Sequence, residues 1–228
     1  MRNHERKRLR THLRLTKKNL QNEYQKYKNP ASEKEADILK AGEILFGEKG
    51  FDGTTTKELA AKAKVTERTL FKYFATKQEL YSRILSGIVY EVAFAVQMVK
   101  LREMLEARKT KFADWYLFMM KDRVAMAREN RHKIRILVTA ILQDADFAEF
   151  FGKVWKENLY EPALDAIRYY QSTGEIRSDV DVETYVRTSY SINISYLLYR
   201  FVIVPDLPVD DDAELKKILH IISQGILA

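Results

Sequence analysis

The stretch from Thr54 to Leu80, TTTKELAAKAKVTERTLFKYFATKQEL, contains three candidate helix starts at short spacing. Thr55 and Thr76 are each followed three residues later by a glutamate, the capping-box arrangement that opens a helix. Between them, Thr66 has a side chain that the N-cap position favours. The segments between these caps are too short to bury an apolar face alone. The pattern therefore predicts the helix-turn-helix plan, two short helices joined by a tight turn, whose second helix enters the DNA major groove.

The charge of this stretch favours a nucleic-acid partner. From Lys57 to Lys77 there are six lysine and arginine side chains against two glutamates, which leaves a local charge of +4. In the second short helix, helical spacing puts Arg68, Thr69 and Lys72 on one face. Arginine and lysine suit guanine edges, and all three side chains can reach phosphates. The alternative is a solvated basic face on an ordinary helical hairpin.

Residues 35–80 resemble the N-terminal domain of the tetracycline-repressor (TetR) family of bacterial transcription regulators. The matching run is AGEILFGEKGFDGTTTKELAAKAKVTERTLFKYFATKQEL, which covers residues 41–80. Two positions depart from the family pattern. Lys64 lies where the family often has glycine at the turn, and lysine can adopt that turn at modest cost. Arg68 lies where glycine is frequent in the second short helix, so the DNA sequence that is bound cannot be copied from relatives.

The expected DNA-binding residues form two groups. Arg68, Thr69 and Lys72 are expected to face base edges. The side chains expected to position the domain on phosphates are Thr55, Thr56, Tyr73 and Lys77. Lys64, in the turn, completes the expected set.

The formal net charge of +7 is concentrated at the N-terminus. Residues 1–30 hold ten lysines and arginines against two glutamates, or +8, so the remaining residues sum to −1. A basic terminal arm is typical of proteins with a polyanionic partner. Three interpretations stay open: the arm follows DNA phosphates or enters the minor groove, it packs against the body, or it is a solvated tail.

Composition and motifs argue against several classes of protein. There is no cysteine, which excludes disulfides and thiolate metal sites. No apolar signal region or membrane-length apolar stretch occurs, so a soluble, cytoplasmic protein is expected. Glycine-rich phosphate loops, G-x-S-x-G and H-E-x-x-H are missing, and the four histidines are scattered. We therefore expect no enzyme, no catalytic residues, no metal site and no cofactor.

The remainder of the chain predicts an all-α protein of about nine helices. Period-2 alternation is not sustained anywhere, so no sheet is expected. Caps and breakers predict helices at about 33–49, from 76 toward 100, 112–129, 131–142, from about 145 to the Gly174 stop, 181–203, and from 210 onward. The expected organisation is a basic arm at 1–31, a helix-turn-helix domain at 32–80 and a helical effector-binding and dimerisation domain at 81–228.

The resemblance implies a homodimer whose body binds a small molecule and thereby releases DNA. The sequence offers apolar and aromatic candidates for such a pocket, with packing in an ordinary core as the alternative. Two polar side chains inside the 181–203 helix are further candidates, because a buried amide requires a partner. The pocket candidates are Trp115, Phe118, Met119, Phe147, Phe150, Trp155, Asn193 and Tyr196. The last two long helices are the expected dimer surface.

These patterns lead to one functional prediction. The chain is expected to be a TetR-type DNA-binding regulator, a repressor that binds a palindromic operator as a homodimer and is released by a small apolar or amphipathic effector. One alternative is a DNA-binding regulator without effector release. The other is a small-molecule binding module or enzyme built on the same helical body.

Overall fold

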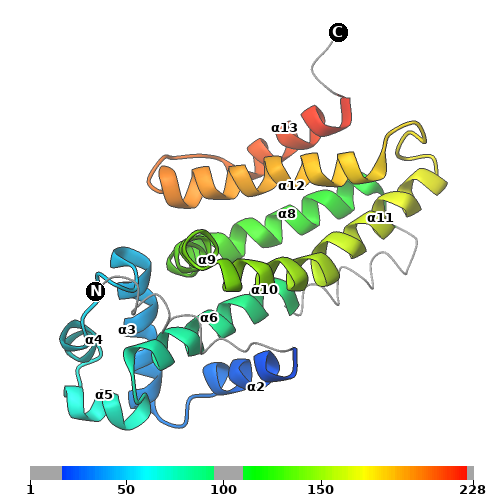
Figure 1. The fold of residues 1–228 in the computed structure, drawn as a ribbon. Helices are drawn as coiled ribbons and strands as arrows, with labels where there is room; N and C mark the ends of the chain where they lie inside the picture. The colour runs from blue at the N-terminus through cyan, green and yellow to red at the C-terminus, as the bar shows by residue number, and fades with distance from the viewer. Residues whose placement is uncertain (1–16, 95–109, 225–228) are drawn as a thin grey trace. The chain divides into compact units, whose positions relative to one another are not determined.

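The computed structural model describes residues 17–94 and 110–224, and every regular element in these ranges is helical (Figure 1). This confirms the predicted all-α class. The chain divides into two compact units. The first comprises residues up to 93 together with 132–153, and the second comprises 94–131 together with 154–228. The predicted boundary at residue 80 divides the chain by function, whereas these units divide it by compactness, so that boundary stays a prediction.

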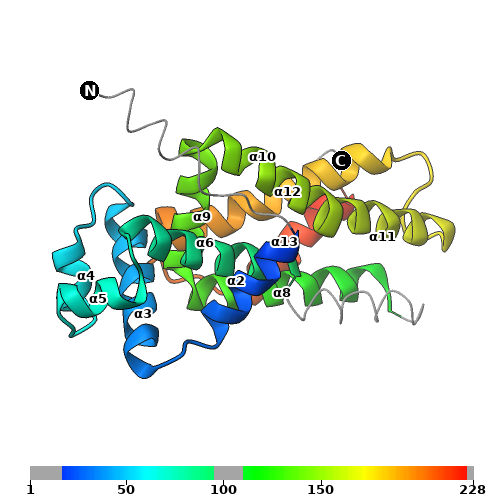
Figure 2. The ribbon, with the colours of Figure 1, turned by 60° about the horizontal axis from the view of Figure 1, so that its bottom comes forward.

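The first unit contains the predicted helix-turn-helix. Its helices are α2 (Lys17–Lys28), α3 (Glu33–Lys49), α4 (Thr56–Lys62), α5 (Glu67–Tyr73), α6 (Lys77–Phe94), α9 (Arg131–Gln143) and most of α10 (Ala145–Trp155). The short helices α4 and α5 lie together against α3 (Figure 2). The predicted bounds of α3 are confirmed. The part of the α6 prediction beyond Phe94 lies outside the described residues.

Fully buried apolar side chains from four helices form the core of the first unit. Leu59 on α4 and Leu70 on α5 are 0 % exposed, as is Phe74 directly after α5. On α6, Leu80 and Ile84 are also 0 % exposed and continue the same core. Burying each such side chain is worth about 1.5–3 kcal/mol, so this core holds two seven-residue helices that could not be stable alone.

The turn between α4 and α5 is made by Lys64 in a left-handed conformation, with φ of 53°. Its N–H donates to the carbonyl of Ala61 at 3.1 Å, and the N–H of Val65 donates to that of Ala60 at 2.9 Å. These two bonds form a Schellman motif, which usually has glycine at the left-handed position. The sequence expectation that lysine adopts this turn is therefore confirmed.

The second unit is a bundle of long helices: α8 (Phe112–Glu129), α11 (Glu161–Ser172), α12 (Val182–Leu198) and α13 (Asp211–Gln224). Five-residue π-helical segments precede α11 (Lys156–Tyr160) and follow α12 (Tyr199–Ile203). Helix α12 packs on α8 and α11 (Figure 1), and α13 also packs on α8. The predicted cap at Asp181 is confirmed, because its carboxylate accepts from the N–H of Thr184 at 2.8 Å.

Candidate nucleic-acid interface

The start of α4 is held by a complete capping box. The N–H of Glu58 donates to Oγ1 of Thr55 at 3.2 Å, and the N–H of Thr55 donates to the Glu58 carboxylate at 2.9 Å. The Lys49 ammonium, which donates to the Glu58 carboxylate at 2.5 Å, and the bonds from Thr55 together hold the pKa of Glu58 at about 2. Thr56 then ties α4 to α5, since its hydroxyl donates to the Glu67 carboxylate at 2.7 Å. The two short helices are thus joined at their N-terminal ends by polar contacts as well as by the core.

One face of α5 is open to solvent and carries both positive charge and an aromatic ring. Arg68 and Lys72 are exposed, as predicted, and Phe71 between them is 43 % exposed. Sequence reasoning missed Phe71, although its spacing of three residues from Arg68 was the available signal. Thr69 is half-buried, and its Oγ1 lies 2.9 Å from that of the N-cap residue Thr66. The thymine methyl and the major-groove edges of bases are the targets that this combination suits.

Two predicted phosphate contacts make internal contacts in this structure. The Tyr73 hydroxyl accepts a hydrogen bond from Ser32 at 2.9 Å, which leaves its own proton available. The Lys77 ammonium donates to the carbonyls of Phe51 and Thr54, both at 2.8 Å, and lies 4.2 Å from the Phe51 ring centroid. Burial lowers the pKa of Lys77. Lys77 therefore braces the turn before α4, a role that its position in the sequence does not reveal.

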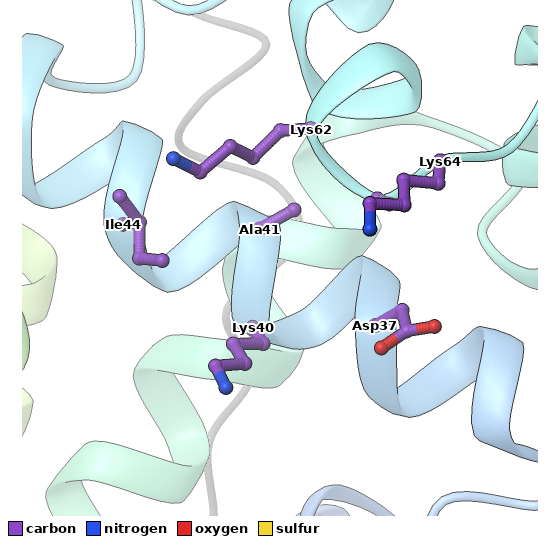
Figure 3. A pocket seen from close by; sticks show the side chains of 7 residues that line it. Asp37, Lys40, Ala41, Ile44, Lys62 and Lys64 are labelled. Carbon is purple, nitrogen blue, oxygen red and sulfur yellow. The ribbon is translucent and has the colours of Figure 1, made fainter.

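A basic crevice lies beside the turn after α4. Lys40 on α3, Lys62 at the end of α4 and the predicted Lys64 surround a hollow of about 220 Å³, with Asp37 at its edge (Figure 3). Lys64 is exposed, in agreement with a role at the surface. Sequence reasoning did not select Lys40 or Lys62, because only the packing of α3 on α4 brings them together.

The two polar pocket candidates in the second unit both have protein partners. Asn193 is 6 % exposed, and its side-chain oxygen accepts a 2.5 Å hydrogen bond from the Tyr116 hydroxyl. The Tyr196 hydroxyl donates to the carboxylate of Asp211 at 2.5 Å. The partner that a buried amide at Asn193 requires is therefore Tyr116 on the neighbouring helix α8.

The aromatic pocket candidates do not gather at one place. Trp115 is 4 % exposed within a cluster of rings that includes Phe112 and Tyr170, and its indole N–H is buried with no hydrogen-bond partner in the described part of the chain. Phe118 and Met119, on the same helix, are half-buried. Phe147, at 1 % exposure, and the half-buried Phe150 form a separate cluster with Phe151 in the first unit.

Trp155 belongs to a third place, a hollow on the outer face of α12. Its ring contacts those of Tyr160 and Tyr190 in the second unit. Of the eight pocket candidates, it alone lines this hollow of about 670 Å³. The other lining side chains come from α12 and the π-helical segment after it: Arg187, Tyr190, Ser191, Ile194, Ser195, Leu198, Tyr199 and Ile203.

Residues 17–94 and 110–224 contain no cluster of three or more histidine, aspartate or glutamate side chains arranged to hold a metal ion. Across the same residues, no helix has the length and apolar character that crossing a membrane requires.

Comparison with known proteins finds a family match for the helix-turn-helix region. Residues 38–84 match the bacterial regulatory proteins of the tetR family. An uncharacterized HTH-type transcriptional regulator of Bacillus subtilis, YvkB, is 26 % identical over 165 residues, which are 72 % of this chain and 80 % of that protein. The matched family and these relatives are regulators rather than enzymes, as the sequence led us to expect.

Solved structures of regulators share the fold of this chain. The structure named "Clostridium perfringens putative fatty acid metabolism regulator" superposes with a TM-score of 0.64 at 21 % identity, over 84 % of this chain and 99 % of that chain. FadR of Bacillus subtilis, solved in complex with stearoyl-CoA, superposes with a TM-score of 0.63 at 15 % identity over the same shares. Residues 38–84 thus match the helix-turn-helix region of tetR-family transcription regulators, and the chain is similar to an HTH-type regulator and has the helical fold of solved regulators.

Proposed function

We propose that this regulator is a homodimeric repressor in the cytoplasm that binds a palindromic operator and leaves it when a small apolar or amphipathic molecule binds its body. The observation that carries the proposal is the exposed face of α5. Arg68, Phe71 and Lys72 are presented together by a helix whose start is capped by Thr66 and whose inner side is fully buried. Because this face is already ordered without DNA, little conformational entropy would be lost when DNA binds.

The contacts divide by the reach of each side chain. Arg68 and Lys72 would bond to base edges, while Phe71 and the Thr69 methyl would meet thymine methyls. The expected phosphate contacts are Thr55, Thr56, Lys64 and Tyr73. Tyr73 still has a proton to donate, and Thr55 and Lys64 are exposed. In this proposal Lys77 supports the site from behind and does not contact DNA.

A second copy of this chain is the proposed occupant of the apolar face of α12 and the segment after it. Ile194, Tyr199 and Ile203 are 46 %, 45 % and 68 % exposed there, beside the hollow of about 670 Å³. Leu215 lies on α13, the other helix expected at the dimer surface, but it is 0 % exposed and belongs to the core of the second unit instead. A two-fold dimer would place two copies of α5 on successive turns of the major groove.

The effector is proposed to enter the aromatic core of the second unit. The buried indole N–H of Trp115, unpaired among the described residues, favours a ligand with a hydrogen-bond acceptor. FadR of Bacillus subtilis, which has this fold, binds stearoyl-CoA in its solved complex, so an acyl compound is the first class to test. The ligand would release DNA only by its difference in affinity between two states.

One experiment tests the whole proposal. The full-length protein is used to select binding sites from random 24-base-pair duplexes, and its mass is measured by analytical ultracentrifugation with and without the selected duplex. We expect an inverted repeat, two subunits per duplex, and release on addition of stearoyl-CoA or stearate. Selection of no sequence, or a monomer on DNA, would overturn the proposal.

A regulator without effector release is the second candidate. It is favoured by one observation: the polar side chains of Asn193 and Tyr196 are already satisfied by Tyr116 and Asp211. In that case the selected duplex would stay bound whatever acyl compound is added, and the apparent melting temperature would not change with ligand.

A further inference from the structure

We infer that helix α2 is a positioning element for the recognition helix α5 and acts on it through the buried side chain of Arg83. The inference rests on the proposed DNA contacts of α5. Helix α2 covers Lys17–Lys28, so it lies outside the matched family region of residues 38–84. The sequence left the role of this arm open among three interpretations, and the structure shows its C-terminal part packed as a helix within the first unit.

Two tyrosines attach α2 to the rest of the unit. Tyr27 is 9 % exposed, and its hydroxyl donates to the Glu43 carboxylate on α3 at 2.6 Å. Its ring lies so close to Gly87 on α6 that a Cβ at residue 87 would overlap it. Tyr24 stacks on Tyr90 of α6 with ring centroids 4.0 Å apart. The helix is therefore in contact with α3 and α6 together.

Arg83 receives its main counter-charge from α2. Its side chain is 11 % exposed, and Nε donates to Oε2 of Glu23 at 2.6 Å. Nη1 lies 3.6 Å from Oε1 of Glu35 on α3. Burial alone would raise the pKa of Glu23, but hydrogen bonds and charge from Lys26 and Arg83 hold it below its ordinary value. Without Glu23, the nearly buried Arg83 guanidinium would keep the longer 3.6 Å pair with Glu35 and lose its short 2.6 Å ion pair, which is strongly unfavourable.

From Arg83 the contacts continue to α5. Glu35 also accepts from the N–H of Ala31 at 2.7 Å, and its own N–H donates to Ser32 at 3.2 Å. The Ser32 hydroxyl in turn donates to the hydroxyl of Tyr73, the last residue of α5.

A second route from Arg83 to α5 runs through an aromatic ring. The Arg83 guanidinium carbon lies 5.7 Å from the ring centroid of Phe74, the residue directly after α5. The C-terminal end of α5 thus has two links to the charge that α2 supplies. We infer that loss of that charge moves α5 and misplaces Arg68 and Lys72 on the DNA bases.

The test uses full-length protein, a duplex selected from random 24-base-pair DNA and a scrambled duplex of the same composition. Glu23→Gln removes the counter-charge at nearly constant shape. Glu48→Gln, at an exposed position on α3, changes the net charge equally and serves as the control. We expect Glu23→Gln to lower the affinity for the selected duplex about tenfold. The affinity for the scrambled duplex and the salt dependence of binding should stay unchanged. The control should behave as the unmodified protein does.

Two further measurements separate positioning from mere stabilisation. In a double-mutant cycle on DNA affinity, Glu23→Gln and Tyr73→Phe should be non-additive, because both interrupt the same chain of contacts. Glu23→Asp should restore part of the discrimination. If Glu23→Gln fails to fold, Gly87→Ala, which displaces the Tyr27 ring without changing charge, is measured in its place and should lose discrimination in the same way.

The outcomes are distinct. If the unmodified protein selects no duplex, the proposed function fails. If it selects one, and Glu23→Gln discriminates as well as Glu48→Gln, the role of α2 is refuted while the proposed function stands. Additive effects in the cycle would likewise overturn the positioning role, because Glu23 would then act on stability alone.

Discussion

The hydroxyl of Tyr196 donates a 2.5 Å hydrogen bond to the carboxylate of Asp211, which is 6 % exposed. The same carboxylate accepts from Arg128 at 2.5 Å and from Arg200 at 3.3 Å. Arg200 also donates to the carbonyl of Pro205 at 3.2 Å. A single acidic side chain thus joins α8, α12 and α13 and closes the loop between the last two helices.

This site predicts a loss of stability in acid. Burial alone would raise the pKa of Asp211, but hydrogen bonds from Tyr196 and Arg128 and the charges of Arg200 and Arg128 lower it below the ordinary value of 3.8. A carboxyl with a depressed pKa in the folded state contributes stability above its unfolded pKa, and this contribution is lost as the pH falls through the folded value. Urea unfolding should therefore show a steep fall in stability below about pH 4.

Asp211→Asn isolates this contribution. At pH 7 the change should lower the free energy of unfolding by about 3 kcal/mol, because it leaves a nearly buried arginine, Arg200, without its carboxylate. The difference from the unmodified protein should shrink at pH 3. Asp212→Asn, at the exposed partner of Lys121, should change stability by less than about 1 kcal/mol. A cost for Asp211→Asn that does not vary with pH would contradict this account.

The left-handed turn predicts opposite effects on stability and DNA binding. Lys64→Gly should stabilise the protein by about 1 kcal/mol, because glycine adopts φ of 53° without steric cost. Lys64→Ala keeps that cost and should leave stability nearly unchanged. Both changes remove the ammonium, so both should weaken binding to every duplex and reduce the salt slope by about one unit. Equal melting temperatures for the two variants would refute the backbone argument.

The exposed face of α5 predicts changes in sequence preference. Arg68→Ala and Lys72→Ala should each cost about 1–3 kcal/mol of discrimination at one base pair of the selected duplex. Phe71→Ala should relax the preference for thymine at a neighbouring position. Thr56→Ala, outside this face, should lower the affinity for every duplex by the same factor. If competition assays show the same loss on every sequence for all four variants, the division into base and phosphate contacts is wrong.

Substitution of Lys77 tests whether this side chain stabilises the turn before α4 or contacts DNA. Lys77→Ala removes two charged hydrogen bonds to the carbonyls of Phe51 and Thr54, so chemical unfolding should show a loss of about 2–3 kcal/mol. The salt slope of DNA binding should stay unchanged, since no phosphate contact is lost. A reduced slope with unchanged stability would instead support the phosphate contact that sequence position alone suggested.

The exposed apolar face of the second unit predicts a dimer that dissociates when one charged side chain is introduced there. Ile203→Glu, at a side chain 68 % exposed, should convert the dimer to monomer in sedimentation equilibrium. It should also weaken operator binding at least tenfold, because each α5 would then bind alone. Leu142→Glu, at a side chain 79 % exposed in the first unit, is the matched control and should stay dimeric. Dissociation by both variants, or by neither, would place the interface elsewhere.

Much of the helical layout follows from local signals. Ser32 and Gly50 delimit α3, and Asp181 starts α12, because caps and breakers act within one turn of the chain. The exposure of Arg68 and Lys72 on α5 was likewise predictable. Burial of Leu70 fixes the rotation of the helix about its axis, and helical spacing then turns Arg68 and Lys72 toward solvent. Phe71 was missed, because adjacent leucine and phenylalanine side chains look equally suited to burial, and only its spacing from Arg68 indicated the exposed face.

The sequence by itself determined the match of residues 38–84 to tetR-family regulators, the helix-turn-helix, and the exposure of Arg68 and Lys72 on α5, because these depend on contacts a few residues apart. Only the tertiary structure decided what Lys77 holds, where Asn193 finds its partner and that α2 packs on α6. Those contacts join residues 23 to 77 positions apart, and their energy depends on distances that no periodicity along the chain encodes.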